Sequence, residues 1–222
     1  MSTSELPASK AEENLRSPFH ELLGNPWFDR AMAVIACIPF VFFGYFRYRH
    51  GGLTIPLVAL WIELALLIVP MIIRRPPKRV SLNPAYWVLT FVETYWLLVP
   101  ILGPGRRIVP SAVSDGLALL ALAVVIWGRL SLGRNIAFIP AQRELVTKGA
   151  YTYMRHPIYT SLFIVYLSVA LDLYSVRNVI LIAIGMFWFV LKSVVEERFL
   201  REDPRYAAYM QRVRARWIPF VV

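Results

Sequence analysis

The sequence has 222 residues, of which 58% are hydrophobic and only 17% are charged. A soluble domain of this size would carry about 25% charged residues, so the composition favours one domain that crosses a membrane several times. The net charge of +10 sits in short polar segments beside apolar tracts, which suits lipid head groups and argues against nucleic-acid binding. One cysteine and three widely separated histidines provide neither a disulfide framework nor the spacing of a metal site.

Residues 1–25 are polar and lack the hydrophobic core of a secretory signal, so we expect a cytoplasmic tail. Six apolar segments follow, each close to the roughly 20 residues that cross a bilayer. Their bounds are 29–46, 53–73, 85–102, 113–130, 158–174 and 176–195. Because the fifth is short and almost touches the sixth, we expect these two to form a tight helical hairpin. The predicted fold class is therefore an all-α polytopic membrane protein with five to six transmembrane helices.

The positions of lysine and arginine predict the orientation, because short cytoplasmic loops are enriched in these residues. With the N-terminus inside, the inner connections carry Arg74, Arg75, Lys78, Arg79, Arg134, Arg143, Lys148 and Arg155. The outer connections carry Arg47, Arg49, Arg106, Arg107 and Arg177. The C-terminal segment adds six arginines between residues 198 and 216 on the inner side. We therefore expect both termini in the cytoplasm.

The stretch from Glu144 to Tyr159 is a polar, aromatic and cationic island between two apolar tracts. Pro157 suits the first turn of a helix, where its missing N–H costs nothing. The free N–H groups and dipole of a helix N-terminus favour an anion, and Arg155 would add a charged fork for it. On composition alone, a juxtamembrane loop that sets topology explains the same residues equally simply.

Three motifs occur in order in the second half of the chain. The first is Leu145-Val146-Thr147 followed by Gly149-x-Tyr151-x-x-x-Arg155-His156-Pro157-x-Tyr159, and the others are Glu196-Glu197-x-x-Leu200 and Tyr206-x-x-Tyr209. Together they resemble the signature of the isoprenylcysteine carboxyl methyltransferase family, integral membrane methyltransferases related to the phospholipid N-methyltransferases. The resemblance covers about residues 128–220.

The resemblance implies S-adenosylmethionine as cofactor, bound on the cytoplasmic side and enclosed by the C-terminal segment. It assigns Arg155 and His156 to the cofactor carboxylate, and Glu196 and Glu197 to its ammonium or ribose hydroxyls. Arg155, Glu196 and Glu197 are the candidate catalytic residues. The other predicted cofactor contacts come from the backbone and aromatic groups of the motifs: Leu145, Val146, Thr147, Gly149, Tyr151, Pro157, Tyr159, Tyr206 and Tyr209.

Each of these residues also has an ordinary structural explanation. Arg155 suits a topology-setting charge, and His156 suits a hydrogen-bonded histidine at the membrane interface. Glu197 suits a solvated helix end, and the tyrosines suit an aromatic belt at the head groups. For Gly149 we expect a positive φ angle or a close backbone approach.

The acceptor is predicted to be lipophilic and to enter from the bilayer. Arg129 and Asn135, at the end of the fourth segment, resemble a region of bacterial relatives and are candidate acceptor-binding residues, or a positive helix end. Acids within membrane segments are expensive, so Glu93 is a candidate for the acceptor cavity, and we expect Glu63 to be hydrogen-bonded between helices. Glu144 and Ser161 replace a histidine and a glycine of the eukaryotic prenylcysteine enzymes. The acceptor therefore stays open among a prenylcysteine-type or isoprenoid carboxylate, a lipid amine and a small thiol.

Two other functions are compatible with the sequence. Some membrane sterol or enone reductases share a similar Arg-His-Pro-x-Tyr segment and use NADPH, whose phosphates Arg143 and Lys148 would suit. A scaffold or transporter would predict paired intramembrane charges and inverted repeats, and neither is evident in the sequence. We divide the chain into a tail (1–25), four transmembrane helices (26–130) and a catalytic core (131–222).

Overall fold

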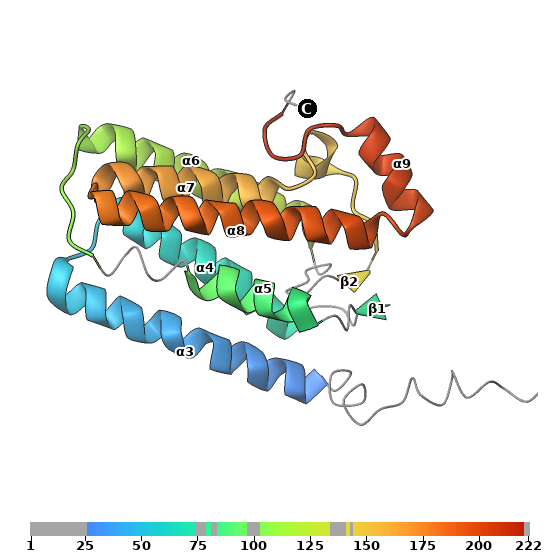
Figure 1. The fold of residues 1–222 in the computed structure, drawn as a ribbon, viewed down its shortest axis with the longest axis horizontal. Helices are drawn as coiled ribbons and strands as arrows, with labels where there is room; N and C mark the ends of the chain where they lie inside the picture. Colours follow the sequence, from blue (N-terminus) through green and yellow to red (C-terminus); the bar gives the residue numbers. More distant parts are fainter. Residues whose placement is uncertain are drawn as a thin grey trace, which may run out of the picture.

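A computed structural model describes residues 26–73, 79–80, 84–96, 103–133, 141–142 and 144–219. The regular secondary structure of this part is helical apart from an isolated bridge between Arg106 and Tyr174 and one short antiparallel pair, in which β1 (Arg79–Val80) pairs with β2 (Ala141–Gln142). The long helices lie side by side, and α9 and the strand pair lie toward one end of them (Figure 1). The predicted helical class is confirmed, whereas the tail of residues 1–25 lies outside the described residues.

Each predicted apolar segment coincides with a helix. These helices are α3 (Pro26–Gly51), α4 (Ile55–Ile73), α5 (Pro84–Trp96), α6 (Ser111–Leu132), α7 (Pro157–Asp172) and α8 (Val176–Leu200), and a short 3₁₀ turn η2 (Gly149–Thr152) and a last helix α9 (Pro204–Arg212) complete the set. Helix α5 is described as far as Trp96, and residues 97–102 of the predicted segment lie outside the described part. Helices α6 and α8 are long and apolar enough to cross a membrane, and the number of true crossings stays a prediction.

Local signals explain how α7 and α8 begin and how they are joined. Pro157 occupies the first turn of α7, where its lack of an N–H costs no hydrogen bond. Ser175 caps α8, because its side chain accepts a hydrogen bond from the backbone N–H of Asn178 at 3.1 Å. The amide of Asn178 in turn donates to the carbonyl of Leu173 at 2.8 Å, which holds the connection of residues 173–175 tight.

The core that positions the site lies where α4, α6 and α7 pack against one another. Small residues on α6 allow the close approach: Ala118 and Ala121 are fully buried, and a side chain at Gly128 would meet Pro157 and Ile158 at 3.4 Å. Tyr166 on α7 packs against Phe189 on α8, with ring centroids 5.7 Å apart. The start of α7, and with it the central motif, is therefore fixed against the end of α6.

The outer surface of the helices is strongly apolar. On α3, Val41 is 68% exposed and Phe42 60%, and on α6, Leu119 is 59% and Leu130 78% exposed. Monomeric soluble proteins rarely expose large apolar patches, so side chains of this kind facing outward on several helices indicate contact with lipid. Together with the two helices that satisfy the length and hydropathy of a span, this surface indicates membrane association.

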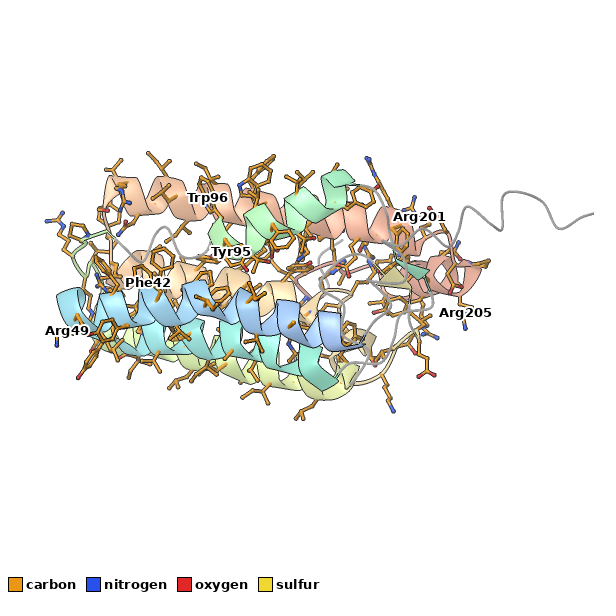
Figure 2. The ribbon with its side chains drawn as sticks, turned by 90° about the horizontal axis from the view of Figure 1, so that it is seen from below. Phe42, Arg49, Tyr95, Trp96, Arg201 and Arg205 are labelled. Atoms are coloured by element: carbon orange, nitrogen blue, oxygen red, sulfur yellow. The ribbon has the colours of Figure 1, made fainter. Side chains whose placement is uncertain are left out.

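Arginines lie at both ends of the helices. Arg49 lies at one end, and Arg201 and Arg205 lie at the other (Figure 2). At the Arg49 end, Arg107 forms an ion pair with Asp172 at 2.7 Å. Arg106 exchanges backbone hydrogen bonds with Tyr174 at 3.0 and 2.9 Å, so the segment before α6 meets the α7–α8 connection. The sequence placed both of these segments on the outer side, and which side of the membrane they occupy stays a prediction.

Helices α5 and α8 are joined by a buried ion pair. Lys192 Nζ lies 2.8 Å from Glu93 Oε2, and both side chains are at most 8% exposed. The apolar segments therefore contain a charge pair that was not evident in the sequence. The two residues are 99 positions apart, a separation at which no local pattern connects them. Glu93 was predicted to bind the acceptor; the structure gives it Lys192 as a partner, and acceptor binding stays a prediction.

Candidate active site

The central motif lies against the C-terminal segment 213–217. The backbone N–H of Arg155 donates to the carbonyl of Ala215 at 3.0 Å, and that of His156 donates to the carbonyl of Arg216 at 2.9 Å. The hydroxyl of Thr160, one turn into α7, donates to the carbonyl of Trp217. These bonds hold the C-terminal segment along the entrance of α7, and the closure of a cofactor pocket by this segment stays a prediction.

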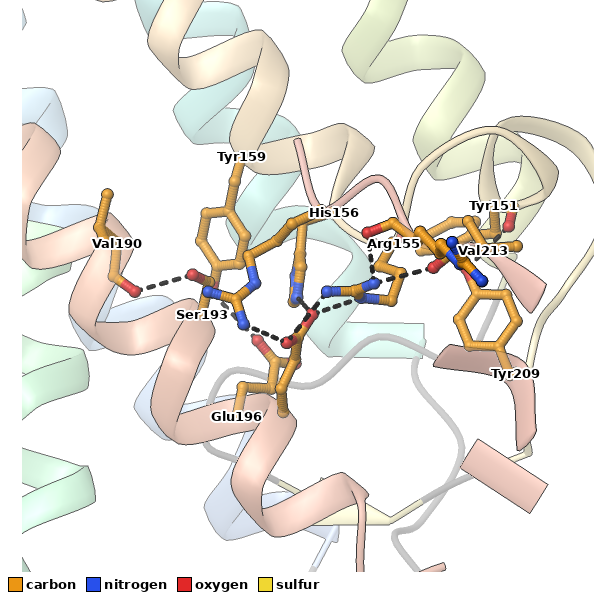
Figure 3. A network of polar contacts seen from close by, with 12 residues as sticks. Tyr151, Arg155, His156, Tyr159, Val190, Ser193, Glu196, Tyr209 and Val213 are labelled. Carbon is orange, nitrogen blue, oxygen red and sulfur yellow. Dashed lines mark hydrogen bonds and ion pairs between the residues drawn. The ribbon is translucent and has the colours of Figure 1, made fainter. Parts of the chain in front are cut away.

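The carboxylate of Glu197, near the end of α8, is the centre of a charged network (Figure 3). Arg155 donates from Nε to Oε1 at 2.6 Å and from Nη2 to Oε2 at 3.3 Å. His156 donates from Nε2 to Oε1 at 3.0 Å, and Arg216 donates from Nη2 to Oε2 at 2.6 Å. Both oxygens are thus shared among charge-assisted hydrogen bonds, which are roughly twice as strong as neutral ones.

Arg155 is almost fully engaged by the protein itself. Its Nη1 donates to the carbonyls of Val213 at 2.8 Å and Arg214 at 2.7 Å, in addition to the two bonds to Glu197. A guanidinium has five N–H groups, so a single one, on Nη2, is left. The structure therefore places Arg155 and His156 on Glu197, and their predicted contact with a cofactor carboxylate stays a prediction. Pro157 directly follows as the first residue of α7.

Glu196 and Glu197, which sequence reasoning treated alike, have different surroundings. Glu197 is 3% exposed and accepts from the side chains of Arg155, His156 and Arg216. Glu196 is half-buried, and its Oε2 accepts one hydrogen bond, from the Tyr159 hydroxyl at 3.2 Å. The Tyr159 ring lies 5.3 Å from the His156 ring. Glu196 is thus the member of the pair with a carboxylate oxygen to spare.

Tyrosines of α9 pack against the loop of the central motif. Tyr206 and Tyr209 lie edge to face, with ring centroids 5.7 Å apart, and pack with Val213, Leu145 and Tyr151. The Tyr209 hydroxyl donates to the carbonyl of Tyr151 at 2.7 Å. Burial raises the pKa of Tyr209 above its ordinary value, so this hydroxyl keeps its proton and its donor role. The structure thus brings the first and third motifs together.

The loop before the motif contains the remaining predicted contacts. Val146 and Thr147 are half-buried, and the Thr147 carbonyl accepts from the hydroxyl of Thr152 at 3.2 Å. Gly149 has a φ angle of +62°, as its expected backbone role requires. The N–H of Ala150 donates to Ser131 Oγ at 3.0 Å, which ties this loop to the end of α6.

Replacing Gly149 with alanine is expected to destabilise the protein by about 2–3 kcal/mol. Roughly 1–2 kcal/mol comes from the left-handed backbone, and a further contribution arises because the new Cβ would overlap Ser131 Oγ and disturb its bond to Ala150. Gly133→Ala is the matched control, since Gly133 has a φ of +60° with no atom within 4 Å of the added Cβ. Denaturant unfolding in detergent compares the two. Equal losses would contradict the role of the Ser131 contact.

Of the predicted acceptor residues, Arg129 lies in the last turn of α6 with 8% exposure, and Asn135 lies outside the described residues. Within the described ranges, no group of three or more histidine, cysteine, aspartate or glutamate side chains is placed to hold a metal ion. Arg216 is a residue of the network that sequence reasoning did not single out. Its only signal was membership in the arginine-rich C-terminal segment.

No curated protein matches the chain. Residues 110–206 match the model of the phospholipid methyltransferase family. This range contains α6, the central motif, α7, α8 and the beginning of α9, so it includes Arg155, His156 and Glu197. The motif-based resemblance is therefore confirmed: residues 110–206 are similar to the phospholipid methyltransferases, the family that includes membrane methyltransferases of the isoprenylcysteine carboxyl type.

Proposed function

We propose that this protein is an integral membrane methyltransferase that uses S-adenosylmethionine and methylates a lipophilic acceptor taken from the bilayer. The observation that carries the proposal is the Glu197 network, which gathers three segments at one end of apolar helices. Three of its members, Arg155, His156 and Glu197, lie within the matched family range. The prenylcysteine-type or isoprenoid carboxylate, the lipid amine and the small thiol are the acceptor classes proposed.

The residues around the network fit the chemical demands of this cofactor. A cofactor carboxylate needs donors, and Arg216 Nε is a buried donor to which no residue in the described ranges offers an acceptor. A cofactor ammonium needs an anionic acceptor, and Glu196 is half-buried with one hydrogen bond. Tyr151, Tyr159 and Tyr206 supply aromatic rings next to these groups. These groups are therefore proposed to hold the cofactor when it binds.

The bound cofactor would supply an electrophilic methyl group, and the protein would align the acceptor and exclude water. A carboxylate acceptor arrives deprotonated and needs no base. An amine or thiol acceptor has to lose a proton. Of the two adjacent glutamates, Glu196 is proposed as the proton acceptor, because both oxygens of Glu197 already accept from cations.

The proposed topology places the site on the cytoplasmic side, with both termini in the cytoplasm and five to six crossings. The excess of lysine and arginine in the predicted inner connections and the C-terminal segment supports this orientation. Arg201 and Arg205 of that segment lie at the end of the molecule that carries the Glu197 network, and Arg49, from an outer connection, lies at the opposite end (Figure 2). We keep the division predicted from the sequence as part of this proposal: a tail (1–25), four transmembrane helices (26–130) and a catalytic core (131–222).

The first test is calorimetric binding of S-adenosylmethionine and its demethylated product to the purified protein in detergent. We expect binding in the micromolar range, weakened about tenfold in Glu196→Gln, because a charge-assisted hydrogen bond to the ammonium is lost. Glu202→Gln, an exposed acid just after α8, is the control and should bind like the wild type.

NADPH serves as the parallel ligand in the same titration. Binding of NADPH without binding of the methyl donor would overturn the proposal and favour a reductase. Binding of neither ligand by protein that retains its helical circular dichroism would also overturn it and favour a scaffold.

A further inference from the structure

Arg129 is a buried cation whose Nε has no hydrogen-bond acceptor among the residues that the structure describes. It lies on α6, is 8% exposed, and its Nε is shielded from solvent without a hydrogen-bond acceptor in the described part of the chain. Glu63, Tyr151 and Tyr159 lie in its electrostatic surroundings, but no ion pair with Glu63 is formed within 4 Å. An uncompensated buried charge is costly, so its presence within a membrane helix indicates a function.

Glu63 faces the same region from α4. It is 2% exposed; its Oε2 lies 3.3 Å from the hydroxyl of Ser161 on α7, and its Oε1 has no partner among the described residues. The three helices that carry Glu63, Arg129 and Ser161 pack against one another. A donor and an acceptor, both buried and both unsatisfied, therefore lie in one inter-helix region beside the tyrosines of the central motif.

Another buried cation in the same protein is satisfied in the usual way. Lys192 on α8 lies 2.8 Å from Glu93 on α5 and is similarly buried. The fold is thus able to pair an intramembrane cation with an acid at hydrogen-bond distance. The lack of such a bond between Arg129 and Glu63 is a specific property of that region and requires its own explanation.

We propose that Arg129 and Glu63 form a head-group subsite that binds the membrane-borne acceptor between α4, α6 and α7. The inference rests on the proposed function in taking the ligand to be the methyl acceptor. Arg129 binds an oxyanion of the acceptor, because a guanidinium is a permanently charged donor matched to carboxylate and phosphate oxygens. Glu63 Oε1 accepts from an N–H or O–H beside that oxyanion. The substrate class is therefore a lipid whose polar end carries an oxyanion next to a hydrogen-bond donor.

The surroundings suit a lipid ligand. The opposite face of α6 is apolar and open, with Ile126 45% and Leu130 78% exposed, so the subsite lies at the depth of the hydrocarbon-facing side chains. Tyr151 and Tyr159, which lie in the electrostatic surroundings of Arg129, also border the Glu197 network. A head group at Arg129 would thus lie next to the region where we propose the methyl donor to bind.

The stability of Arg129→Met separates a ligand-binding role from a structural one. If the charge is uncompensated in the free protein, methionine should leave the midpoint of thermal unfolding unchanged or raise it. Lys192→Met is the matched control, because it removes a buried cation that is paired; its midpoint should fall by roughly 6–12 °C. A fall for Arg129→Met as large as that for Lys192→Met would show a structural role and overturn the inference.

Ligand binding is measured with two pairs of short-chain probes in detergent, followed by tryptophan fluorescence. The first pair is phosphatidylethanolamine and phosphatidylcholine, which share a phosphate but differ in the N–H donor. The second pair is N-acetyl-farnesylcysteine and its methyl ester, which differ in the oxyanion. We expect the wild type to bind the first member of one pair at least tenfold more tightly than the second. A preference in the first pair identifies a phosphate as the bound oxyanion, and a preference in the second pair identifies a carboxylate.

Arg129→Met should abolish that preference, and Glu63→Gln should weaken it, while both variants keep the calorimetric affinity of the wild type for S-adenosylmethionine. No preference in the wild type, or a preference retained in Arg129→Met, overturns the subsite. Loss of methyl-donor binding in the wild type would instead contradict the proposed function, so the two failures are distinguishable.

Discussion

Replacing Glu197 with glutamine is expected to lower the free energy of unfolding by about 3–5 kcal/mol, the usual cost of breaking a buried ion pair from one side. Glu197 is the common acceptor for Arg155, His156 and Arg216. Glutamine is neutral and presents an N–H₂ group to side chains that are themselves donors. Arg155, 9% exposed, would be left without its counter-charge. Denaturant unfolding in detergent, followed by circular dichroism, measures the loss.

Glu196→Gln is the matched control for this experiment. The two residues are adjacent on α8, but Glu196 accepts a single hydrogen bond, from Tyr159 at 3.2 Å, which glutamine can also accept. We expect its free energy of unfolding to change by less than about 1 kcal/mol. Equal stability of the two variants would show that the Glu197 network does not hold the C-terminal segment on the motif.

Replacing Lys192 with methionine is the second change expected to have a large effect, again about 3–5 kcal/mol of lost stability. The reason is that Glu93, 3% exposed, would remain as an unpaired acid between α5 and α8. The double variant Glu93→Gln/Lys192→Met should recover most of the loss, because both charges are removed and glutamine still accepts from the Thr94 hydroxyl. Thermal and denaturant unfolding of Glu93→Gln, Lys192→Met and the double variant give a double-mutant cycle for this pair.

Arg49→Met serves as a control for removing a cation as such. Arg49 is exposed and lies at the opposite end of the helices from Arg201 (Figure 2), so its replacement should leave stability within about 0.5 kcal/mol. If the double variant were as unstable as Lys192→Met alone, the 2.8 Å contact would not be the source of the effect.

The helices were predictable from the sequence because each is an apolar run bounded by polar residues, prolines or glycines. The run from residue 157 illustrates this: Pro157 begins α7, and Asp172 ends it within two residues of the predicted limit. The family was predictable because its motifs are local in the chain. The number of crossings was not, since an apolar helix of 16 residues such as α7 fits either a tilted span or a buried helix.

The sequence did not predict which charged residues pair with one another. Arg155 and Glu197 are 42 residues apart, and Glu93 and Lys192 are 99 apart, so only the packing of helices brings them together. Glu196 and Glu197 were indistinguishable for a related reason. Successive residues of a helix point about 100° apart, and which of two neighbours faces the bundle depends on the rotation of α8 against its neighbours. Glu63 was expected to be hydrogen-bonded between helices, and its contact with Ser161 agrees with this for one of its two oxygens.

Because the central motif is hydrogen-bonded to the C-terminal segment, the site can form only after that segment has been synthesised. The carbonyl of Val213, which Arg155 Nη1 contacts, leaves the ribosome 58 residues after Arg155 itself. The apolar segments that become α7 and α8 emerge in between. Until the C-terminal segment has been synthesised, Arg155 is solvated by water and lacks the backbone carbonyls of Val213 and Arg214 that it contacts in the folded protein. A ribosome that stops shortly before residue 213 would therefore leave a chain in which Arg155 lacks its backbone acceptors.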